Sequence, residues 1–217
     1  MLYLYYYEGE LPPSELLRAR LGDAAEGIRR PESLMWRLLL KQALCDLAAE
    51  KAEVILPRIR STESGKPYAE GVQFDFSPTH TKGLVALAVG DCGLIGLDAE
   101  APRGRDISRL ARAADRWFTP AENRRVQAAM RNRPHKAEEV FLRVWTAKEA
   151  LVKRTGAGLA GMRRADTRHH AGCTLQTFDR SDFILTLAVA SPEVPEFRRV
   201  FSDCGGKERP WRGRGSS

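Results

Sequence analysis

Three carboxylates and a lysine stand in two short segments whose spacing suits metal-assisted chemistry on a phosphate. Glu149 and Lys153 are four residues apart in Trp-Thr-Ala-Lys-Glu-Ala-Leu-Val-Lys, and residues four apart share one face of a helix. Asp98 and Glu100 are two apart in Gly-Leu-Asp-Ala-Glu, and that spacing directs two side chains to one face of a strand. Because Mg²⁺ is bound by one or two carboxylates together with phosphate oxygens and water, the two segments predict a magnesium and phosphate site.

Simpler explanations exist for both segments. An Asp-x-Glu pair at a strand end is often just solvated, and Glu149 with Lys153 would be an ordinary surface ion pair contributing a few tenths of a kcal/mol. The apolar run at 94–97 weighs against the first explanation, because carboxylates presented by apolar chain need a cation or a donor. At about 100° per residue, Glu149 and Lys153 border the apolar stripe of their helix, which weighs against the second.

The first half of the chain contains the expected pattern of a helix followed by a hairpin. Apolar residues predict a strand over 2–7 and a buried strand over 84–89. A helix is expected over 34–50, with Ser33 as its cap. The turn-forming residues at 90–93 predict that the buried strand forms a hairpin with the segment that ends in the acidic pair.

The second half repeats this pattern. A helix is expected over 137–153, stopped by the glycines of Gly-Ala-Gly at 156–158. Two strands are expected over 174–178 and 183–190. The segment Arg37-(x3)-Lys-Gln-Ala-Leu in the first helix resembles Arg143-(x4)-Lys-Glu-Ala-Leu in the second. Chance explains such a similarity equally well, because these residues are common in helices.

We therefore expect an α+β fold of two similar α/β subdomains related by pseudo-two-fold symmetry. Each would have a long helix packed on a small antiparallel sheet. The expected bounds are 1–102 for the N-terminal subdomain and 103–204 for the C-terminal subdomain. The Gly- and Arg-rich segment 205–217 is expected to be a disordered tail.

Composition restricts the classes of function. A chain of 217 residues with 43% hydrophobic residues is long enough for one large core or two small ones. Its net charge of +7 favours anionic partners such as nucleotides, acidic proteins or nucleic acid. The four cysteines are scattered without a Cys-x-x-Cys pair, which argues against a zinc site or a disulfide framework. No segment approaches the roughly 20 apolar residues that span a bilayer, so we expect a cytoplasmic protein without a membrane partner.

The order of five motifs resembles the 4′-phosphopantetheinyl transferases over roughly residues 30 to 160. By itself, Gly-Lys-Pro at 65–67 is a plausible plain turn. The histidine of Phe-Ser-Pro-Thr-His-Thr at 76–81 precedes a strand, and a loop histidine is usually just exposed. The acidic pair, Phe-Thr-Pro-Ala-Glu at 118–122 and the helix segment at 145–159 follow in order. The length resembles that of the surfactin-synthetase-activating subtype, in which two similar halves form a pseudodimer within one chain. The resemblance therefore implies a monomer.

The resemblance also implies roles for particular residues. Asp98, Glu100 and Glu149 would bind Mg²⁺, Glu149 would help to deprotonate the attacking serine, and Lys153 would stabilise or protonate the departing phosphate. Coenzyme A, the implied co-substrate, would be bound by Arg30, Arg37, Lys66, Thr79 and His80. The implied activity is holo-carrier-protein synthesis: 4′-phosphopantetheine moves from coenzyme A to a serine of an apo acyl or peptidyl carrier protein, releasing 3′,5′-adenosine bisphosphate. Thr79-His-Thr81 stands where the family usually has Ser-His-Ser.

Three other classes remain open from the residues alone. The first is a catalytically silent relative that binds coenzyme A or a carrier protein, against which the intact carboxylates and lysine argue. The second is a magnesium-dependent phosphatase or nuclease, which would not need the Gly-Lys-Pro and Thr-His-Thr segments. The third is a nucleic-acid-binding module, but the basic residues are dispersed among acidic ones. We expect no nucleic-acid partner.

Overall fold

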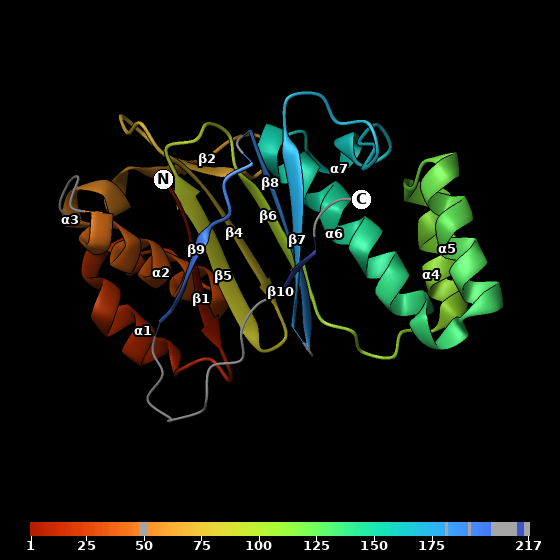
Figure 1. Ribbon diagram of the computed structural model, residues 1–217. Helices are drawn as coiled ribbons and strands as arrows, with labels where there is room; N and C mark the ends of the chain where they lie inside the picture. The colour runs from red at the N-terminus through yellow and green to blue at the C-terminus, as the bar shows by residue number, and fades with distance from the viewer. Residues whose placement is uncertain (48–51, 181, 191, 201–211, 215–217) are drawn as a thin grey trace.

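A computed structural model of the protein describes residues 1–47, 52–180, 182–190, 192–200 and 212–214 (Figure 1). Its strands are β1 (Leu2–Glu8), β2 (Ile59–Ser61), β3 (Pro67–Ala69), β4 (Asp75–Thr81), β5 (Leu84–Gly90), β6 (Gly96–Glu100), β7 (Thr174–Arg180), β8 (Phe183–Val189), β9 (Glu196–Arg199) and β10 (Arg212–Arg214). Its α-helices are α1 (Ser14–Leu21), α2 (Pro31–Leu47), α3 (Ala52–Ile55), α4 (Ile107–Trp117), α5 (Pro120–Asn132), α6 (Ala137–Thr155) and α7 (Gly158–Gly161).

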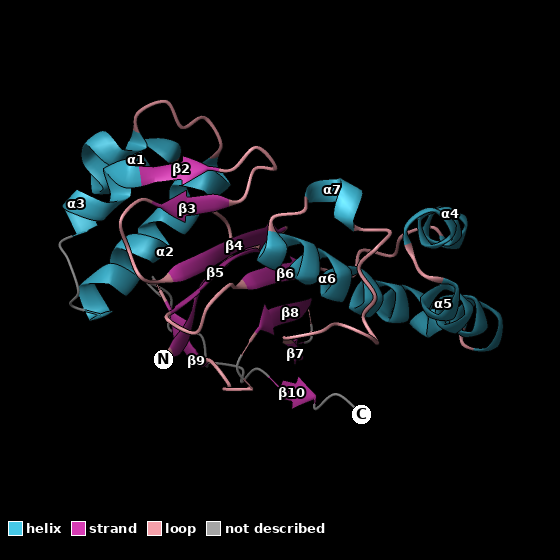
Figure 2. Ribbon diagram, turned by 90° about the horizontal axis from the view of Figure 1, so that it is seen from above, coloured by secondary structure: helices cyan, strands magenta, loops and turns pink. Residues whose placement is uncertain are grey.

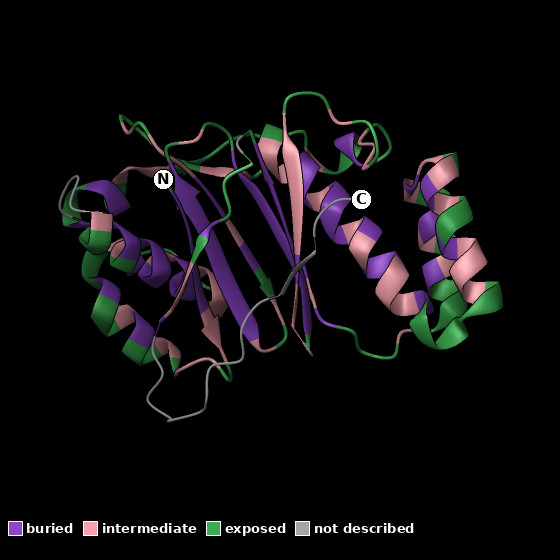
Figure 3. Ribbon diagram, in the orientation of Figure 1, coloured by how far each residue is buried: buried purple, intermediate pink, exposed green. Residues whose placement is uncertain are grey.

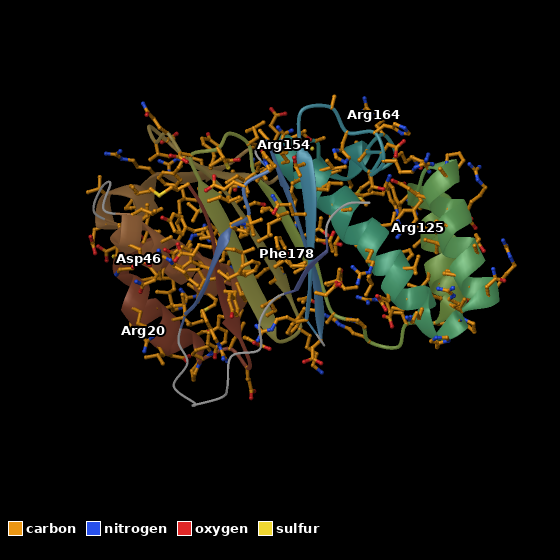
Figure 4. All side chains as sticks on the ribbon, in the orientation of Figure 1. Arg20, Asp46, Arg125, Arg154, Arg164 and Phe178 are labelled. Atoms are coloured by element: carbon orange, nitrogen blue, oxygen red, sulfur yellow. The ribbon has the colours of Figure 1, made fainter. Side chains whose placement is uncertain are left out.

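Two four-stranded sheets pack against each other in the middle of the molecule (Figure 1). The first has the strand order β4-β5-β1-β9 and the second the order β10-β7-β8-β6. Alternate residues of β1 explain why both faces of the first sheet are buried: Leu2, Leu4 and Tyr6 join the core between the sheets, whereas Tyr3 and Tyr5 join a second core under the helices. Phe178 of β7 lies between the sheets (Figure 4).

Helices cover the outer faces of both sheets. Leu34, Leu38 and other apolar residues of α2 pack on the first sheet together with α1. Helix α6 packs on β6 and β8 of the second sheet, and α4 and α5 pack on α6 at one end of the molecule (Figure 2). Buried residues accordingly follow the central strands and the sheet-facing sides of α2 and α6 (Figure 3).

Residues at the helix ends account for several boundaries. Helix α2 begins at Pro31, three residues before the expected start, because proline is well suited to a first helical turn. Ser33 therefore lies inside the helix and is not its cap. Thr119 and Glu122 form a capping box at the start of α5. Gly156 ends α6 in the left-handed conformation (φ 67°), as the sequence predicted.

The connectivity of the two sheets repeats. In the first half β1 precedes α2, the hairpin β4–β5 follows, and β1 pairs antiparallel with β5. In the second half β6 precedes α6, the hairpin β7–β8 follows, and β6 pairs antiparallel with β8. The expected α+β class, with a long helix on a small antiparallel core in each half, agrees with this arrangement.

The hairpin expected between β5 and β6 is wrong. Both edges of β5 are occupied, by β1 and β4, so β6 has no place beside it and pairs with β8 in the other sheet. The expected subdomain boundary at residue 102 therefore lies between β6 and the strands of the sheet that β6 joins. Strand β9, which follows the second-half hairpin in sequence, joins the first sheet and pairs in parallel with β1.

Two further expectations differ from the structure. The segment Phe-Ser-Pro-Thr-His, which we expected to be a loop, lies in β4, where proline is tolerated because β4 is an edge strand. Within the expected disordered tail, Arg212–Arg214 form β10, which pairs with β7; the rest of that tail lies outside the described residues. Among the described residues, no helix is long and apolar enough to cross a membrane.

Candidate active site

Strand β6 presents its acidic residues to helix α6. Leu97 and Ala99 join the core between the sheets, so the alternate residues Gly96, Asp98 and Glu100 face the other way. A side chain at Gly96 would place its Cβ 1.9 Å from the Ala150 carbonyl oxygen of α6. The lack of a side chain at this position therefore lets the strand lie directly against the helix that carries Glu149 and Lys153.

Side chains of β4 close the seam between the two sheets. The backbone N–H groups of Ile95, Leu97 and Ala99 donate to Asp75 Oδ2 at 2.7 Å, Ser77 Oγ at 3.0 Å and Thr79 Oγ1 at 3.1 Å. These contacts repeat every second residue on both segments, which is the period of side chains on a strand. They satisfy amides that the edge strand β6 would otherwise bury without partners.

A cleft of about 530 Å³ runs over this seam. All of the sequence-predicted site residues line it except Arg30: Arg37, Lys66, Thr79, His80, Asp98, Glu100, Glu149 and Lys153. Arg30 is exposed immediately before α2 and is not part of the cleft wall. Residues from both halves thus form one cavity, although up to 116 residues of chain separate Arg37 from Lys153.

Asp98 and Lys153 form the central ion pair of the cleft. The Lys153 ammonium lies 2.7 Å from Asp98 Oδ1, and the Thr79 hydroxyl lies 3.3 Å from the same oxygen. The side chain of Asp98 is only 10% exposed, and its other oxygen, Oδ2, is buried without a hydrogen-bond partner. A buried carboxylate oxygen without a partner is costly, so this atom is a natural position for a bound cation.

The other two carboxylates have raised pKa values. Burial raises the pKa of Glu149, the negative charges of Asp98 and Glu100 raise it further, and Lys153 opposes the shift. Burial also raises the pKa of Glu100, followed by the charge of Asp98, while Arg105 opposes it. Arg105 donates to Glu100 Oε2 at 2.6 Å. Glu100 and Glu149 thus hold protons more tightly because they are partly buried beside other negative charges, and an added divalent cation would relieve this repulsion.

These oxygen donors suit Mg²⁺ better than zinc or copper, since hard oxygen ligands are those that Mg²⁺ prefers. Asp98, Glu100 and Glu149 therefore fit a magnesium ion in chemical type and charge. In the part of the chain that the structure describes, no three His, Cys, Asp or Glu side chains are already arranged around a common point as a metal site. Lys153 engages Oδ1 of Asp98 and Arg105 engages Oε2 of Glu100, so a metal ion would be bound through the other oxygen of each carboxylate.

Lys66 lines the cleft but its ammonium is already engaged. It lies 2.6 Å from Asp75 Oδ2 and donates to the carbonyl oxygens of Ile95 and Arg154, both at 3.2 Å. Arg154 lies near the C-terminal end of α6 (Figure 4). Lys66 therefore joins the β2–β3 hairpin, β4, the start of β6 and the end of α6.

Arg37 and His80 are better placed for an anionic ligand. His80 is exposed on β4 at the wall of the cleft. The Arg37 guanidinium lies 4.1 Å from the centroid of the Trp36 ring, donates to the Ser33 carbonyl oxygen, and has a pKa lowered by burial. Both are cationic or hydrogen-bonding groups on the side of the cleft formed by the first half.

Sequence reasoning missed a buried ion pair beside the site. Lys148, next to Glu149, is fully buried and lies 3.0 Å from Glu122 Oε2. The other Glu122 oxygen accepts from the amide and hydroxyl of Thr167, each at 2.8 Å. The capping pattern Thr-x-x-Glu that begins α5 was visible in the sequence, but its lysine partner was not. The pair fixes α5 and the segment around Thr167 to α6.

A cleft with three carboxylates and a lysine in its wall suits an enzyme that acts on phosphate esters, and comparisons with known proteins agree. A family model described as the 4′-phosphopantetheinyl transferase superfamily matches residues 94–193. The chain is 34% identical over 148 residues to 4′-phosphopantetheinyl transferase AcpT of Salmonella typhi, covering 67% of this chain and 69% of that protein. The chain belongs to the 4′-phosphopantetheinyl transferase superfamily, and the expected enzyme class is confirmed.

Two other relatives extend the comparison. The chain is 31% identical over 172 residues to AcpT of Escherichia coli K12, covering 78% of this chain and 80% of that one. It is 28% identical over 176 residues to a 4′-phosphopantetheinyl transferase of Bacillus subtilis, covering 72% and 75% of the two chains. All three names describe transfer of the 4′-phosphopantetheine group.

Proposed function

We propose that this protein transfers 4′-phosphopantetheine from coenzyme A to a serine of an apo acyl or peptidyl carrier protein, with Mg²⁺ bound and 3′,5′-adenosine bisphosphate released. The names of the relatives support the transfer. The observation that carries the magnesium-dependent form is the face-to-face placement of β6 and α6. It gathers Asp98, Glu100, Glu149 and Lys153 in the wall of one cleft.

Asp98, Glu100 and Glu149 would hold the metal. The unpaired Asp98 Oδ2 and the raised pKa values of Glu100 and Glu149 support this assignment. When bound, Mg²⁺ would offset negative charge on the diphosphate of coenzyme A. All three residues would supply carboxylate oxygens, which are the ligands that Mg²⁺ prefers.

Glu149 and Lys153 would carry the proton and charge movements. A serine hydroxyl is a weak nucleophile near neutral pH, so its proton must pass to a nearby base, and a carboxylate with a raised pKa suits this task better than an ordinary one. Glu149 is such a carboxylate. Lys153, on the same face of α6, would stabilise or protonate the departing phosphate.

Coenzyme A would lie along the wall formed by the first half. Arg37 and His80 have groups available to bind its phosphates, and Thr79 would contribute its hydroxyl near Asp98. Lys66 would bind a phosphate of the coenzyme only if its ammonium group left Asp75. Arg30, outside the cleft wall, would contribute to the coenzyme only as a neighbouring positive charge for the 3′-phosphate.

We further propose that the protein acts as a monomer whose two halves are related by a pseudo-two-fold axis. Support for the monomer comes from the cleft, to which one chain supplies both walls. Support for the axis comes from the repeated order of strand, helix and hairpin in the two halves.

The first experiment is intact-protein mass spectrometry of purified apo carrier proteins incubated with the enzyme, coenzyme A and Mg²⁺. We expect a gain of one phosphopantetheine mass that is lost on chelation of the metal. Asp98→Asn and Glu149→Gln should each slow the transfer by at least about 100-fold, as removal of a group that stabilises transition-state charge does, while the fold persists.

Glu53→Gln is the matched control, because this glutamate is 70% exposed on α3 and outside the cleft wall. It should transfer at the wild-type rate. Normal transfer by either cleft variant would remove the metal assignment. Coenzyme A binding without transfer to any carrier would instead identify a silent binding relative, and hydrolysis of phosphate esters or nucleic acid would identify the phosphatase or nuclease alternative.

A further inference from the structure

Arg105 lies between two carboxylates that come from different elements. Its Nη2 donates to Glu100 Oε2 of β6 at 2.6 Å, and its Nη1 donates to Glu138 Oε1 of α6 at 2.9 Å. The same Nη1 donates to the Ala101 carbonyl oxygen at 2.9 Å. The guanidinium side chain is 27% exposed, Glu100 25% and Glu138 16%, so this chain of contacts is shielded from solvent over most of its surface.

Glu138 holds the segment that carries Arg105. Besides Arg105 it accepts hydrogen bonds from the backbone amides of Arg103 at 3.0 Å and Gly104 at 2.8 Å. These contacts lower the pKa of Glu138 although burial opposes them. Glu138 lies in the first turn of α6, where a negative charge is favourable. The segment after β6 is therefore fixed to the N-terminal end of α6.

The consequence is a rigid connection between two carboxylates of the cleft. Helix α6 carries Glu149 directly, and through Glu138 and Arg105 it also fixes the carboxylate of Glu100. Arg105 engages Oε2, which leaves Oε1 of Glu100 for another ligand. Hydrogen bonds from outer residues commonly fix the orientation of carboxylates that bind metals.

We propose that Arg105, held by Glu138, is a positioning residue that orients Glu100 for a divalent metal ion in the cleft. This inference rests on the proposed function, since it takes Asp98, Glu100 and Glu149 as the metal ligands. Arg105 acts through Glu100 and touches neither substrate nor metal. Its guanidinium suits the task because a planar fork binds two carboxylates in fixed directions, which an ammonium group does not.

Two other roles for Arg105 make different predictions. As an ordinary surface ion pair, Arg105 would contribute little to stability and nothing to metal affinity. As a competitor that occupies the metal's place, its removal would strengthen metal binding. A positioning role predicts the opposite: removal weakens metal binding and raises the Mg²⁺ concentration needed for turnover, whereas turnover at saturating Mg²⁺ recovers.

The test is a titration of the purified full-length protein with Mn²⁺, with free Mn²⁺ followed by electron paramagnetic resonance, and with Mg²⁺ by calorimetry. Arg105→Met should raise the Kd for Mn²⁺ by about 10-fold or more, the range found when outer-shell partners of metal ligands are removed. Glu138→Gln should change the Kd in the same direction. Arg105→Lys should recover part of the loss. Arg109→Met, a change of an exposed arginine on α4, should bind as the wild type does.

The outcomes separate this inference from the function on which it rests. Wild-type or tighter Mn²⁺ binding by Arg105→Met would overturn the positioning role. A loss of thermal stability in Arg105→Met with an unchanged Kd would also overturn it, because the arginine would then only support the fold. Asp98→Asn in the same titration tests the proposed function itself. If Asp98→Asn also binds the metal normally and turnover needs no Mg²⁺, the metal-dependent function is wrong. If Asp98→Asn loses metal binding and Arg105→Met does not, only the role of Arg105 is rejected.

Discussion

At the scale of single residues, the cleft is a balance of three carboxylates against two cations. Lys153 neutralises Asp98, and Arg105 neutralises Glu100. In the described part of the chain, Glu149 has no side-chain hydrogen bond or ion pair. Besides burial, the charges of neighbouring residues shift its pKa. The residue expected to act as the base is thus the one whose ionised form is stabilised least, a common property of groups that exchange protons.

Because no ion pair within the described residues balances the charge of Glu149, we expect the stability of the fold to depend on pH. The raised pKa of Glu149 means that the folded protein binds a proton at this site more tightly than the unfolded chain does. Ionised Glu149 therefore destabilises the fold above that pKa, and the penalty disappears as pH falls through the raised value towards the ordinary 4.5. We expect Glu149→Gln to raise the Tm by a few degrees near pH 8, and the difference to shrink at acid pH.

Thermal unfolding over a range of pH, in a metal-free buffer, measures this effect. Glu53→Gln again provides the comparison, since its carboxylate is exposed on α3. Addition of Mg²⁺ should raise the Tm of the wild type more than that of Glu149→Gln. A Glu149→Gln protein less stable than the wild type near pH 8 would show that the carboxylate supports the fold.

At the scale of elements, the site depends on how closely β6 lies against α6. Gly96 is the point of contact, and the alternation that starts there brings Asp98 and Glu100 to the helix. On the other side of the seam, β4 supplies side chains where a neighbouring strand would supply carbonyl groups: Asp75, Ser77 and Thr79 accept the amides of the β6 segment. The position of Thr79 follows from this pairing, which also brings its hydroxyl to Asp98.

The contact at Gly96 predicts a large effect of a single methyl group. In Gly96→Ala the new Cβ would meet backbone atoms, the Ala150 oxygen at 1.9 Å and the Arg154 nitrogen at 2.5 Å. Because backbone cannot move aside as a flexible side chain can, we expect a loss of about 3 kcal/mol or more in the free energy of unfolding together with loss of transfer. Urea denaturation measures the first and mass spectrometry the second.

Gly161→Ala on α7 is the matched variant, because its overlaps are smaller: its Cβ would lie 2.7 Å from Ala157 Cβ and 3.3 Å from Val152 Cγ2. It should lose less stability than Gly96→Ala. Equal losses in the two variants would contradict the view that β6 and α6 are held at their closest possible distance.

At the scale of the whole molecule, the two halves are joined across the cleft. Their sheets share one core, β9 of the second half pairs with β1 of the first, and Lys66 connects β4 with the end of α6. Glu8 of β1 and Arg180 of β7 form a further ion pair between the sheets at 3.0 Å. The cleft therefore forms only where the halves are assembled.

Lys66 is the residue at which this structural role and the expected coenzyme role diverge. Its side chain is 11% exposed and that of Asp75 16%, and removal of one partner from a buried ion pair costs about 3–5 kcal/mol. We expect Lys66→Met to lower the free energy of unfolding by several kcal/mol in urea denaturation. The double variant Lys66→Met with Asp75→Asn should recover part of it, because no charge is then left unpaired.

Lys82→Met, at an exposed position after β4, should leave stability unchanged. If Lys66→Met instead kept its stability and only raised the KM for coenzyme A, Lys66 would be a ligand of the coenzyme, as the family resemblance implied, and the structural role would be wrong.

Local patterns in the sequence predicted much of this protein. Helix α6, strands β1, β5, β7 and β8, and the end of α6 at Gly156 follow from spacing and from residue conformational preference, which act within a few neighbours along the chain. The same spacing placed Glu149 and Lys153 on one face and Asp98 and Glu100 on another. Helices α1, α4 and α5 were not predicted, and Pro78 concealed β4, because a proline is compatible with a strand only at a sheet edge that the sequence does not reveal.

What the sequence alone determined is which residues are candidates for the chemistry and which local element presents most of them. The tertiary structure decided which elements meet: β6 pairs with β8 and not with β5, Lys66 binds Asp75, Lys148 binds Glu122, and Arg105 connects Glu100 with Glu138. The physical reason is range. Helical and strand periodicity depends on backbone geometry within a few residues, whereas strand partners and buried ion pairs depend on which distant surfaces the shared core brings together, and a one-dimensional pattern does not specify those distances.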